Sequence, residues 1–356
     1  MRCKLGLDVG GAVKNLIVCA AMLAIAFSAS AAEQPAEKKT VEEFKALYKR
    51  PAEIPFPADN PYSFAKASLG EMLFFDPRIS GANYISCASC HNPAFSWGDN
   101  LPRGIGFGMT VLGRRTPTVL NAAWADLLMW DGRKATLEEQ ALGPISAAPE
   151  MNQNLETLPA KLAAIAGYRE QFAAIFPGQG ITVDTIGKAI ATYERTIVSG
   201  TAPFDEWIAG KETALSDSAK RGFIVFNTKG NCAACHSGWN FTDNSFRDIG
   251  LPDADLGRGK IVNLPSMQHA FKTPTLRDID RRGPYMHDGS LPTLMAVVEH
   301  YDRGGEERPS RSDEIRPLHL SQEEKDDLVT FLHTLTGTSP PIHLPVLYSG
   351  EHTAER

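Results

Sequence analysis

CASCH, from Cys87 to His91, and CAACH, from Cys232 to His236, are the two stretches that decide the fold of this chain. Cys-x-x-Cys-His is the attachment signature of c-type haem, in which two thiols add across the haem vinyl groups and the histidine supplies an imidazole to the iron. The predicted haem-binding residues are Cys87, Cys90, His91, Cys232, Cys235 and His236. A single Cys-x-x-Cys also occurs in redox dithiols and zinc sites, but a histidine directly after it, twice in one chain, favours a dihaem cytochrome.

The sequence around the motifs predicts a mainly α fold with two cytochrome-c-like domains, each with one covalently attached haem c. Residues 69–76 and 221–227 show helical spacing of apolar residues, so each half repeats a short helix that leads into a loop and then a motif. Gly70 and Gly222 occupy matching positions in these helices. Either they mark a close crossing of two helices, or they are incidental and each costs about 1 kcal/mol of helix stability relative to alanine.

Helix ends set the predicted domain boundaries. An apolar stripe predicts a helix over residues 183–197 that ends near Gly200, and Pro203 follows. The last helix begins after Ser321, with Glu324 at the capping-box position. The predicted segments are a signal peptide (1–32), an extended N-terminal arm rich in proline (33–60), an N-terminal haem domain (61–200), a C-terminal haem domain (201–338) and a tail (339–356).

The start of the chain predicts export to the periplasm. Three basic residues accompany an apolar stretch, residues 16–27, that is too short to span a bilayer, and small residues at 29–32 suit signal cleavage. A retained membrane anchor and a lipoprotein through Cys19 are the alternatives. Cys3 and Cys19 leave with the signal and the other four cysteines lie in the motifs, so no disulfide is available and the haems must organise the packing.

Charge and length exclude other classes of protein. The net charge of the 356 residues is −6, and it becomes −8 when the leader, with three basic residues and one acidic residue, is removed. Such an acidic chain is not suited to nucleic acid. The roughly 324 remaining residues suffice for two domains with their own cores. No later apolar run is long enough to cross a membrane, so we expect a protein that is not membrane-embedded after cleavage.

Three further segments resemble the bacterial dihaem cytochrome c peroxidase and MauG superfamily. They are RTPTVLNAAWADLLMWDGR at 115–133, EEQALGPISAAPEM at 138–151 and KTPTLRDIDRRGPYMHDGSLPTL at 272–294. The resemblance extends over roughly residues 60–337. It implies that hydrogen peroxide reacts at the haem of the N-terminal domain, and that the protein acts with a protein substrate or a small redox-protein donor.

The resemblance makes the sixth ligand of each iron decisive, because an iron with two strong protein ligands carries electrons whereas an open iron binds peroxide. Family peroxidases that need prior reduction carry a histidine in the glycine-rich loop after the first haem. This loop reads GIGFG here, with Phe107 at the histidine position. Phenylalanine cannot ligate iron, so the first haem is predicted to be open, with Phe107 in its distal pocket. Met109 or Met129 as sixth ligand is the alternative.

At the second haem, the position where family peroxidases place a methionine ligand is Tyr301. A phenolate is a hard anionic donor that favours ferric iron, whereas a thioether favours ferrous iron. The resemblance therefore predicts Tyr301 as the axial partner of His236. A role for Tyr301 in the core is the alternative, with iron ligation by a neighbouring histidine or a methionine instead. The competing side chains are His300, Met267, Met286 and Met295.

The resemblance assigns five further residues around the haems. Trp130 is placed between the haems as an electron relay, and Glu150 matches the distal glutamate that moves a proton during cleavage of peroxide. Gln140 and Pro144 match the rest of this distal pocket, and His287 is a structural residue near the second haem. By frequency alone, the tryptophan would be a core residue and the glutamate a surface charge.

Two departures from the family pattern leave questions open. Relatives hold calcium between the haems through an asparagine, whose position here is Arg115, and two carbonyls that would come from Arg282 and Pro284. A fixed cation repels calcium, so the site is either lost or replaced by the guanidinium. MauG also carries a tryptophan just before its second motif, where this chain has Gly230. Trp239 is either a substitute electron exit or a packing residue.

Taken with the resemblance, these residues imply a periplasmic MauG-like dihaem oxidase. It would use hydrogen peroxide, or oxygen plus electrons, to complete tryptophan tryptophylquinone formation in the methylamine dehydrogenase precursor by long-range electron transfer. One alternative is a dihaem cytochrome c peroxidase that takes electrons from a small cytochrome or cupredoxin. The other is a dihaem electron carrier without catalysis. Tyr301 argues against the first alternative, and Phe107 against the second.

Overall fold

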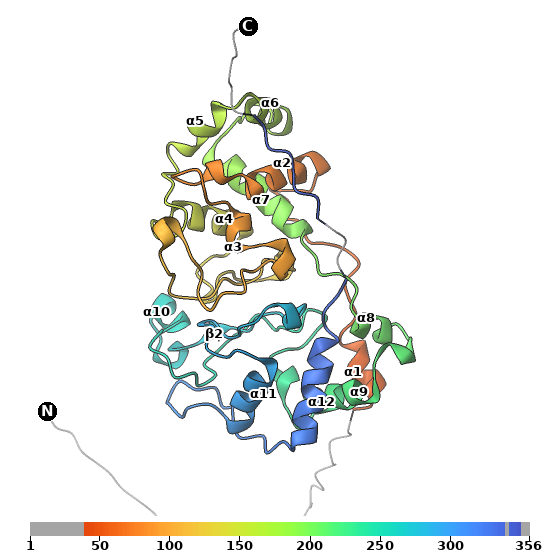
Figure 1. Ribbon diagram of the computed structural model, residues 1–356. Coiled ribbons are helices and arrows are strands. Elements are labelled where there is room, and N and C mark those ends of the chain that lie inside the picture. Colours follow the sequence, from red (N-terminus) through yellow and green to blue (C-terminus); the bar gives the residue numbers. More distant parts are fainter. Residues whose placement is uncertain (1–38, 339–341, 350–356) are drawn as a thin grey trace, which may run out of the picture. The chain divides into compact units, whose positions relative to one another are not determined.

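The computed structural model describes residues 39–338 and 342–349, and it confirms the mainly α fold (Figure 1). The predicted signal peptide and part of the predicted tail lie outside these residues. Across the described ranges, none of the helices combines the length and apolar character needed to traverse a bilayer. The elements below all belong to one compact unit that begins at Thr40.

The N-terminal half is built around two crossing helices. Its core consists of buried side chains drawn from residues 69–197, among them Leu73, Phe74 and Ile190. Thr182 caps the long helix α7 through the backbone N–H of Thr185, where the apolar stripe predicted a helix. The helices of this half are α2 (Phe64–Phe75), α3 (Cys87–Cys90), α4 (Leu137–Ser146), α5 (Leu158–Ala163), α6 (Ala166–Ile175) and α7 (Val183–Thr196).

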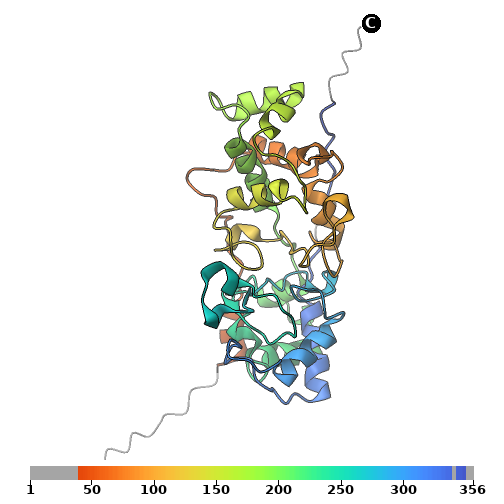
Figure 2. The same cartoon turned by 90° about the vertical axis from the view of Figure 1, so that its left-hand side faces the viewer.

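The C-terminal half has its own core, drawn from Tyr48 and residues 204–335. Ser321 and Glu324 form the predicted capping box at the start of its last helix. Its elements are α8 (Pro203–Ile208), α9 (Asp217–Asn227), β1 (Phe246–Arg247), α10 (Arg258–Val262), β2 (Phe271–Lys272), α11 (Leu294–Arg303) and α12 (Gln322–His333). The two strands pair antiparallel, with Phe246 opposite Lys272. Figures 1 and 2 both show α2–α7 in one half and α8–α12 in the other.

The predicted domain boundary at residue 200 stays a prediction. The arm and the tail do not follow it simply, because each packs on the half of the protein that is farther from it in the sequence. The arm predicted as extended contains a short helix, α1 (Val41–Ala46), and Tyr48 after it is buried in the C-terminal core, where its hydroxyl donates to Asn227 Oδ1 (2.8 Å). The tail returns to the other half, because the ring of Tyr348 packs edge-on against Tyr168 (centroids 5.0 Å apart). Each half is therefore completed by a segment from the far end of the chain (Figure 1).

The halves share one detail of packing ahead of their haem motifs. A Cβ on Gly70 of α2 would lie 2.0 Å from the carbonyl oxygen of Ala189 in α7, and a Cβ on Gly222 of α9 would lie 2.0 Å from that of Asp327 in α12. Both glycines therefore mark close helix crossings, which decides between the two interpretations of the sequence. The loop that carries each motif leaves a helix held by such a crossing.

Alanine at Gly70 or Gly222 is expected to destabilise the protein, although alanine is the better helix former by about 1 kcal/mol. The methyl group would overlap a backbone carbonyl, and overpacking of this kind costs about 1–3 kcal/mol. Thermal unfolding of the haem-loaded variants, followed by circular dichroism, measures the loss. Gly143→Ala is the control, because a Cβ there would meet only Lys134, at 3.8 Å. An equal loss at Gly143 would contradict this explanation.

Candidate haem sites

The first motif borders a cavity of about 470 Å³ in the N-terminal half. Cys87 and Cys90 lie in α3, and His91 follows as the C-cap of this helix. Helix α4 and the turn after it contribute further lining residues that the sequence predicted. The predicted residues that border this cavity are Cys87, Cys90, His91, Trp130, Gln140, Pro144 and Glu150.

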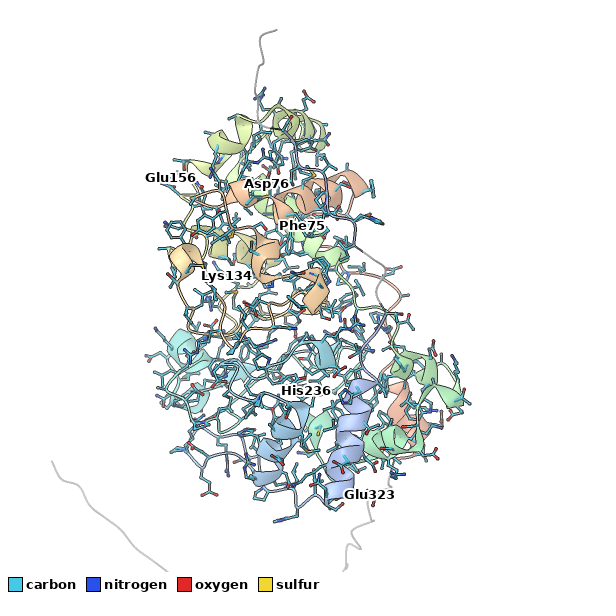
Figure 3. The ribbon with its side chains drawn as sticks, in the orientation of Figure 1. Phe75, Asp76, Lys134, Glu156, His236 and Glu323 are labelled. Carbon is cyan, nitrogen blue, oxygen red and sulfur yellow. The ribbon has the colours of Figure 1, made fainter. Side chains whose placement is uncertain are left out.

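The second motif borders a separate cavity of about 270 Å³ in the C-terminal half. The motif follows α9, and Figure 3 labels His236 in this half. Tyr301 lies in α11 and borders the same cavity, so the structure brings together the two predicted ligands of the second iron. The predicted residues that border this cavity are Cys232, Cys235, His236, Trp130, Arg282, His287 and Tyr301.

Both histidines are oriented in a way that fits haem. Nδ1 of His91 donates to the carbonyl oxygen of Trp97 (3.2 Å), and Nδ1 of His236 donates to that of Phe241 (2.9 Å). These backbone acceptors fix the proton on Nδ1 and leave Nε2 with a lone pair for a metal. Burial lowers the pKa of both rings and so keeps them neutral, the form that ligates iron.

The cysteines complete the match to haem c. Each pair borders the same cavity as its histidine, which is the arrangement that two thioether bonds and one axial ligand require. Before haem attachment, burial raises the pKa of Cys90 to about 11 and that of Cys235 to about 12, so both side chains are then neutral thiols. The residues present therefore fit two covalently attached haems.

Glu150 is held at the N-terminal cavity by an unusually close backbone approach. A Cβ on Gly106 would lie 2.0 Å from the carbonyl oxygen of Pro149, and the N–H of Phe107 donates to the carbonyl oxygen of Glu150 (2.8 Å). The GIGFG loop therefore fixes the turn that carries the glutamate. Burial raises the pKa of Glu150, opposed by the positive charge of Arg133.

Phe107 itself lies differently from the prediction. It is not among the side chains that border the cavity, because its ring stacks on Tyr84 (centroids 6.0 Å apart), and Gly106 borders the cavity in its place. Of the methionine alternatives, Met109 is 74% exposed and lies away from the cavity, whereas Met129 borders it and accepts a weak hydrogen bond from Gln140 Nε2 (3.7 Å).

The structure also separates the candidates for the second iron. His300 does not border the cavity, and its Nε2 is occupied because it donates to the carbonyl oxygen of Ile249 (2.9 Å). Met267 and Met295 do not border the cavity, whereas Met286 does. Burial raises the pKa of Tyr301, so a phenolate at this position needs a positive partner such as ferric iron.

The wall between the two cavities contains Arg115, Met129 and Trp130, which border both. Trp130 Nε1 donates to the carbonyl oxygen of Arg115 (2.8 Å), and the N–H of Lys272 donates to the carbonyl oxygen of Trp130 (2.8 Å). Trp130 is therefore held from both halves of the chain, through its indole by Arg115 and through its backbone by Lys272. His287 is buried beside this wall and stacks on Phe271 (centroids 3.5 Å apart).

Two further predicted residues, besides Phe107, lie outside the cavity linings. Pro284 borders neither cavity. Trp239 also borders neither, and it packs edge-on against Trp124 (centroids 4.8 Å apart) with the guanidinium groups of Arg50 and Arg277 at 5.5 and 5.9 Å from its ring. Two nearby positive charges disfavour a positive charge on the indole, so this arrangement supports packing over an electron exit.

Sequence reasoning missed two ionisable side chains at the cavities, the buried Glu194 and the partly buried Lys272. Glu194 borders the N-terminal cavity with an unpartnered Oε2, and burial raises its pKa to about 8. Lys272 borders the C-terminal cavity, and burial lowers its pKa to about 8. Their positions in the sequence could have identified both residues as candidates. Glu194 directly follows Tyr193 of the apolar stripe, and Lys272 is the first residue of the third segment that resembles the family.

Comparisons with known proteins agree with this geometry. The family model for di-haem cytochrome c peroxidase matches residues 64–213, and the model for cytochrome c matches residues 219–336. Methylamine utilization protein MauG of Methylorubrum extorquens is 47% identical over 93% of this chain and 96% of its own. Cytochrome-c peroxidase IdrP1 of Pseudomonas sp. is 34% identical over 95% of this chain and 96% of its own. A crystal structure of a MauG-like protein associated with microbial copper homeostasis has a TM-score of 0.75 at 31% identity, over 82% of this chain and 95% of that one.

Proposed function

Because this chain belongs to the di-haem cytochrome c peroxidase and MauG family, we propose that it completes tryptophan tryptophylquinone formation in the methylamine dehydrogenase precursor. The chain is a haem-dependent oxidoreductase with two haem c groups, and the proposal adds the substrate. The oxidant is hydrogen peroxide, or oxygen plus electrons, and the location is the periplasm. The precursor docks as a protein, so its oxidation proceeds by long-range electron transfer.

The observation that carries the proposal is the difference between two cavities that share a wall. No tyrosine borders the first cavity, where the carboxyl groups are those of Asp131, Glu150 and Glu194. Tyr285 and Tyr301 border the second cavity, where the carboxyl group is that of Glu314. A haem bound in the first cavity would supply an iron that activates peroxide. Cys87, Cys90 and His91 hold this group, and Cys232, Cys235, His236 and Tyr301 hold the second.

The side chains of the first cavity handle protons. Glu150 takes a proton from the near oxygen of peroxide and returns it to the far oxygen, which then leaves as water. Gln140 and Pro144 border the same cavity, and the amide of Gln140 is positioned by its contact with Met129. Conversion of peroxide to two water molecules takes up two electrons and two protons in all, and the docked substrate supplies both as it is oxidised. Trp130 is the route by which the two cavities share the electrons, because it borders both.

The purified ferric protein with both haems attached tests the proposal. Electron paramagnetic resonance should show one high-spin iron and one low-spin iron. With peroxide and a precursor that carries a partly modified tryptophan pair, we expect the absorbance of the quinone to appear. Two low-spin irons would contradict an open first site. A precursor that stays unchanged while peroxide is consumed would contradict the substrate.

A second function, peroxide removal with electrons from a small cytochrome or cupredoxin, is favoured by the cytochrome-c peroxidase that matches nearly the whole chain. Steady-state turnover with such a donor separates the two functions. High turnover that does not depend on any quinoprotein precursor would support the peroxidase. A tyrosine-ligated iron resists reduction, so slow turnover with the donor, limited by reduction of the C-terminal haem, would support the oxidase.

Replacing Trp130 by phenylalanine is expected to slow quinone formation about tenfold or more, equivalent to about 1.4 kcal/mol of activation free energy. The smaller ring leaves a gap in the wall and removes the hydrogen bond to the carbonyl oxygen of Arg115. Stopped-flow spectroscopy should show that the initial reaction with peroxide keeps its rate. Trp207→Phe, in the core away from both cavities, is the control. Equal effects at both tryptophans would contradict a relay at Trp130.

A further inference from the structure

We infer that Arg115 is a permanent cation built into the wall between the two haem cavities, where it takes the place of a divalent metal ion and, with Arg282, pairs with haem propionate carboxylates. The inference rests on the presence of two haems and not on the identity of the substrate. It concerns how this chain balances charge between its cofactors.

Two buried guanidinium groups contact no carboxylate of the described residues, although Asp99 attracts that of Arg115 and Asp278 attracts that of Arg282 from a longer distance. Among the described residues, four arginines are less than one-tenth exposed. Arg195 pairs with Glu138 (2.6 Å) and Arg277 pairs with Asp205 (2.9 Å), whereas Arg115 and Arg282 form no ion pair with any described Asp or Glu. A buried charge without a partner is strongly unfavourable, so a partner is expected from outside the polypeptide.

Both guanidinium groups belong to residues that border the haem cavities. Arg115 borders both cavities and is 5% exposed, and Arg282 borders the C-terminal cavity and is 4% exposed. Nε of each has no hydrogen-bond partner.

The anion is a haem propionate. Haem carries two propionate groups, and each haem is fixed in its cavity by a motif on this chain. A guanidinium binds a carboxylate through two parallel hydrogen bonds, which uses donors such as the free Nε. The cofactor therefore brings a carboxylate into direct contact with these groups, which no described Asp or Glu does. No other carboxylate source is needed.

Arg115 takes the place of the calcium ion. Nη2 of Arg115 donates to the carbonyl oxygen of Arg282, one of the oxygens that the family resemblance assigned to calcium, and Pro284 borders neither cavity. Calcium needs six to eight oxygen ligands, and a guanidinium offers none. The residues present therefore do not fit calcium, and the positive charge is supplied by a side chain instead. Trp130 is bonded to the backbone of the same residue, so the cation also lies beside the proposed relay.

Metal analysis of the holoprotein tests this inference without any variant. The wild-type protein as purified should contain no bound calcium, and dialysis against a calcium chelator should leave its absorption spectrum and both haem reduction potentials unchanged. One tightly bound calcium ion per chain, whose removal shifts the spectrum or the potentials, would overturn the inference.

Arg115→Asn removes the cation and restores an oxygen ligand. We expect this variant to bind calcium, with haem potentials that shift on chelation and recover on readdition. Arg115→Lys keeps the positive charge, so this variant should remain independent of calcium. An ammonium group cannot form the two parallel hydrogen bonds of a guanidinium, so the propionate bending bands in resonance Raman spectra should shift. Arg195→Lys is the matched control, since its partner is Glu138. Propionate bands that are identical in Arg115→Lys and in the wild-type protein would overturn the pairing.

Discussion

Replacing Glu150 by glutamine is expected to slow the reaction of the protein with hydrogen peroxide by about 10²–10⁴-fold, the usual size of a general acid–base contribution. Glutamine has almost the same shape and keeps the turn intact, because the hydrogen bond from Phe107 is to the backbone of residue 150. It cannot take a proton from the near oxygen of peroxide. Stopped-flow spectroscopy of the haem-loaded protein measures the rate constant of the first step.

The pH dependence separates loss of a base from loss of shape. Burial raises the pKa of Glu150, and a base acts only when deprotonated. The wild-type rate should therefore fall as the pH drops through this raised pKa, above the range of an exposed glutamate at about 4.3. In Glu150→Gln the same fall should be absent.

Glu156→Gln is the matched control for this prediction. Glu156 is exposed and borders neither cavity, and Figure 3 labels it at the outer edge of the N-terminal half. We expect the Glu156 variant to keep both the rate and the pH profile of the wild-type protein. A full rate in Glu150→Gln, or equal losses in both variants, would contradict proton transfer by Glu150.

Features that arise from residues close together in the chain could be predicted from the sequence. Each Cys-x-x-Cys-His motif carries its chemistry within five residues, and the capping box at Ser321 and Glu324 is equally local. The stripe that predicted a helix over 183–197 has a period that only a helix explains. For Gly70 and Gly222 the sequence left two interpretations, because the partner helices lie more than a hundred residues away.

Features that depend on approach between distant segments could not be predicted. The order of residues in the GIGFG loop does not show that Gly106 rather than Phe107 faces the cavity, since this follows from contact with Pro149. Nothing in the sequence of the tail indicates that Tyr348 packs on Tyr168. Likewise, an arginine is recognised as unpaired only when all its neighbours are known.

Replacing Tyr301 by phenylalanine is expected to raise the reduction potential of the C-terminal haem by on the order of 0.1 V or more, within the roughly 0.8 V that axial ligands control. A phenolate is negatively charged and stabilises ferric iron, so its loss makes reduction easier. Phenylalanine keeps the ring in the cavity and removes only the oxygen. Spectroelectrochemical titration measures the potential, and paramagnetic resonance should show that this iron becomes high-spin.

Two controls decide whether the tyrosine is the ligand. His300→Gln should leave the potential unchanged, because the ring of His300 donates to the carbonyl oxygen of Ile249 and not into the cavity. Met286 borders the cavity, so Met286→Leu tests the remaining competitor. A shift in the methionine variant with none in Tyr301→Phe would move the ligand to sulfur. A sulfur ligand would make this iron easy to reduce, and the chain would then be better suited to receiving electrons from a donor than to withdrawing them from a protein substrate.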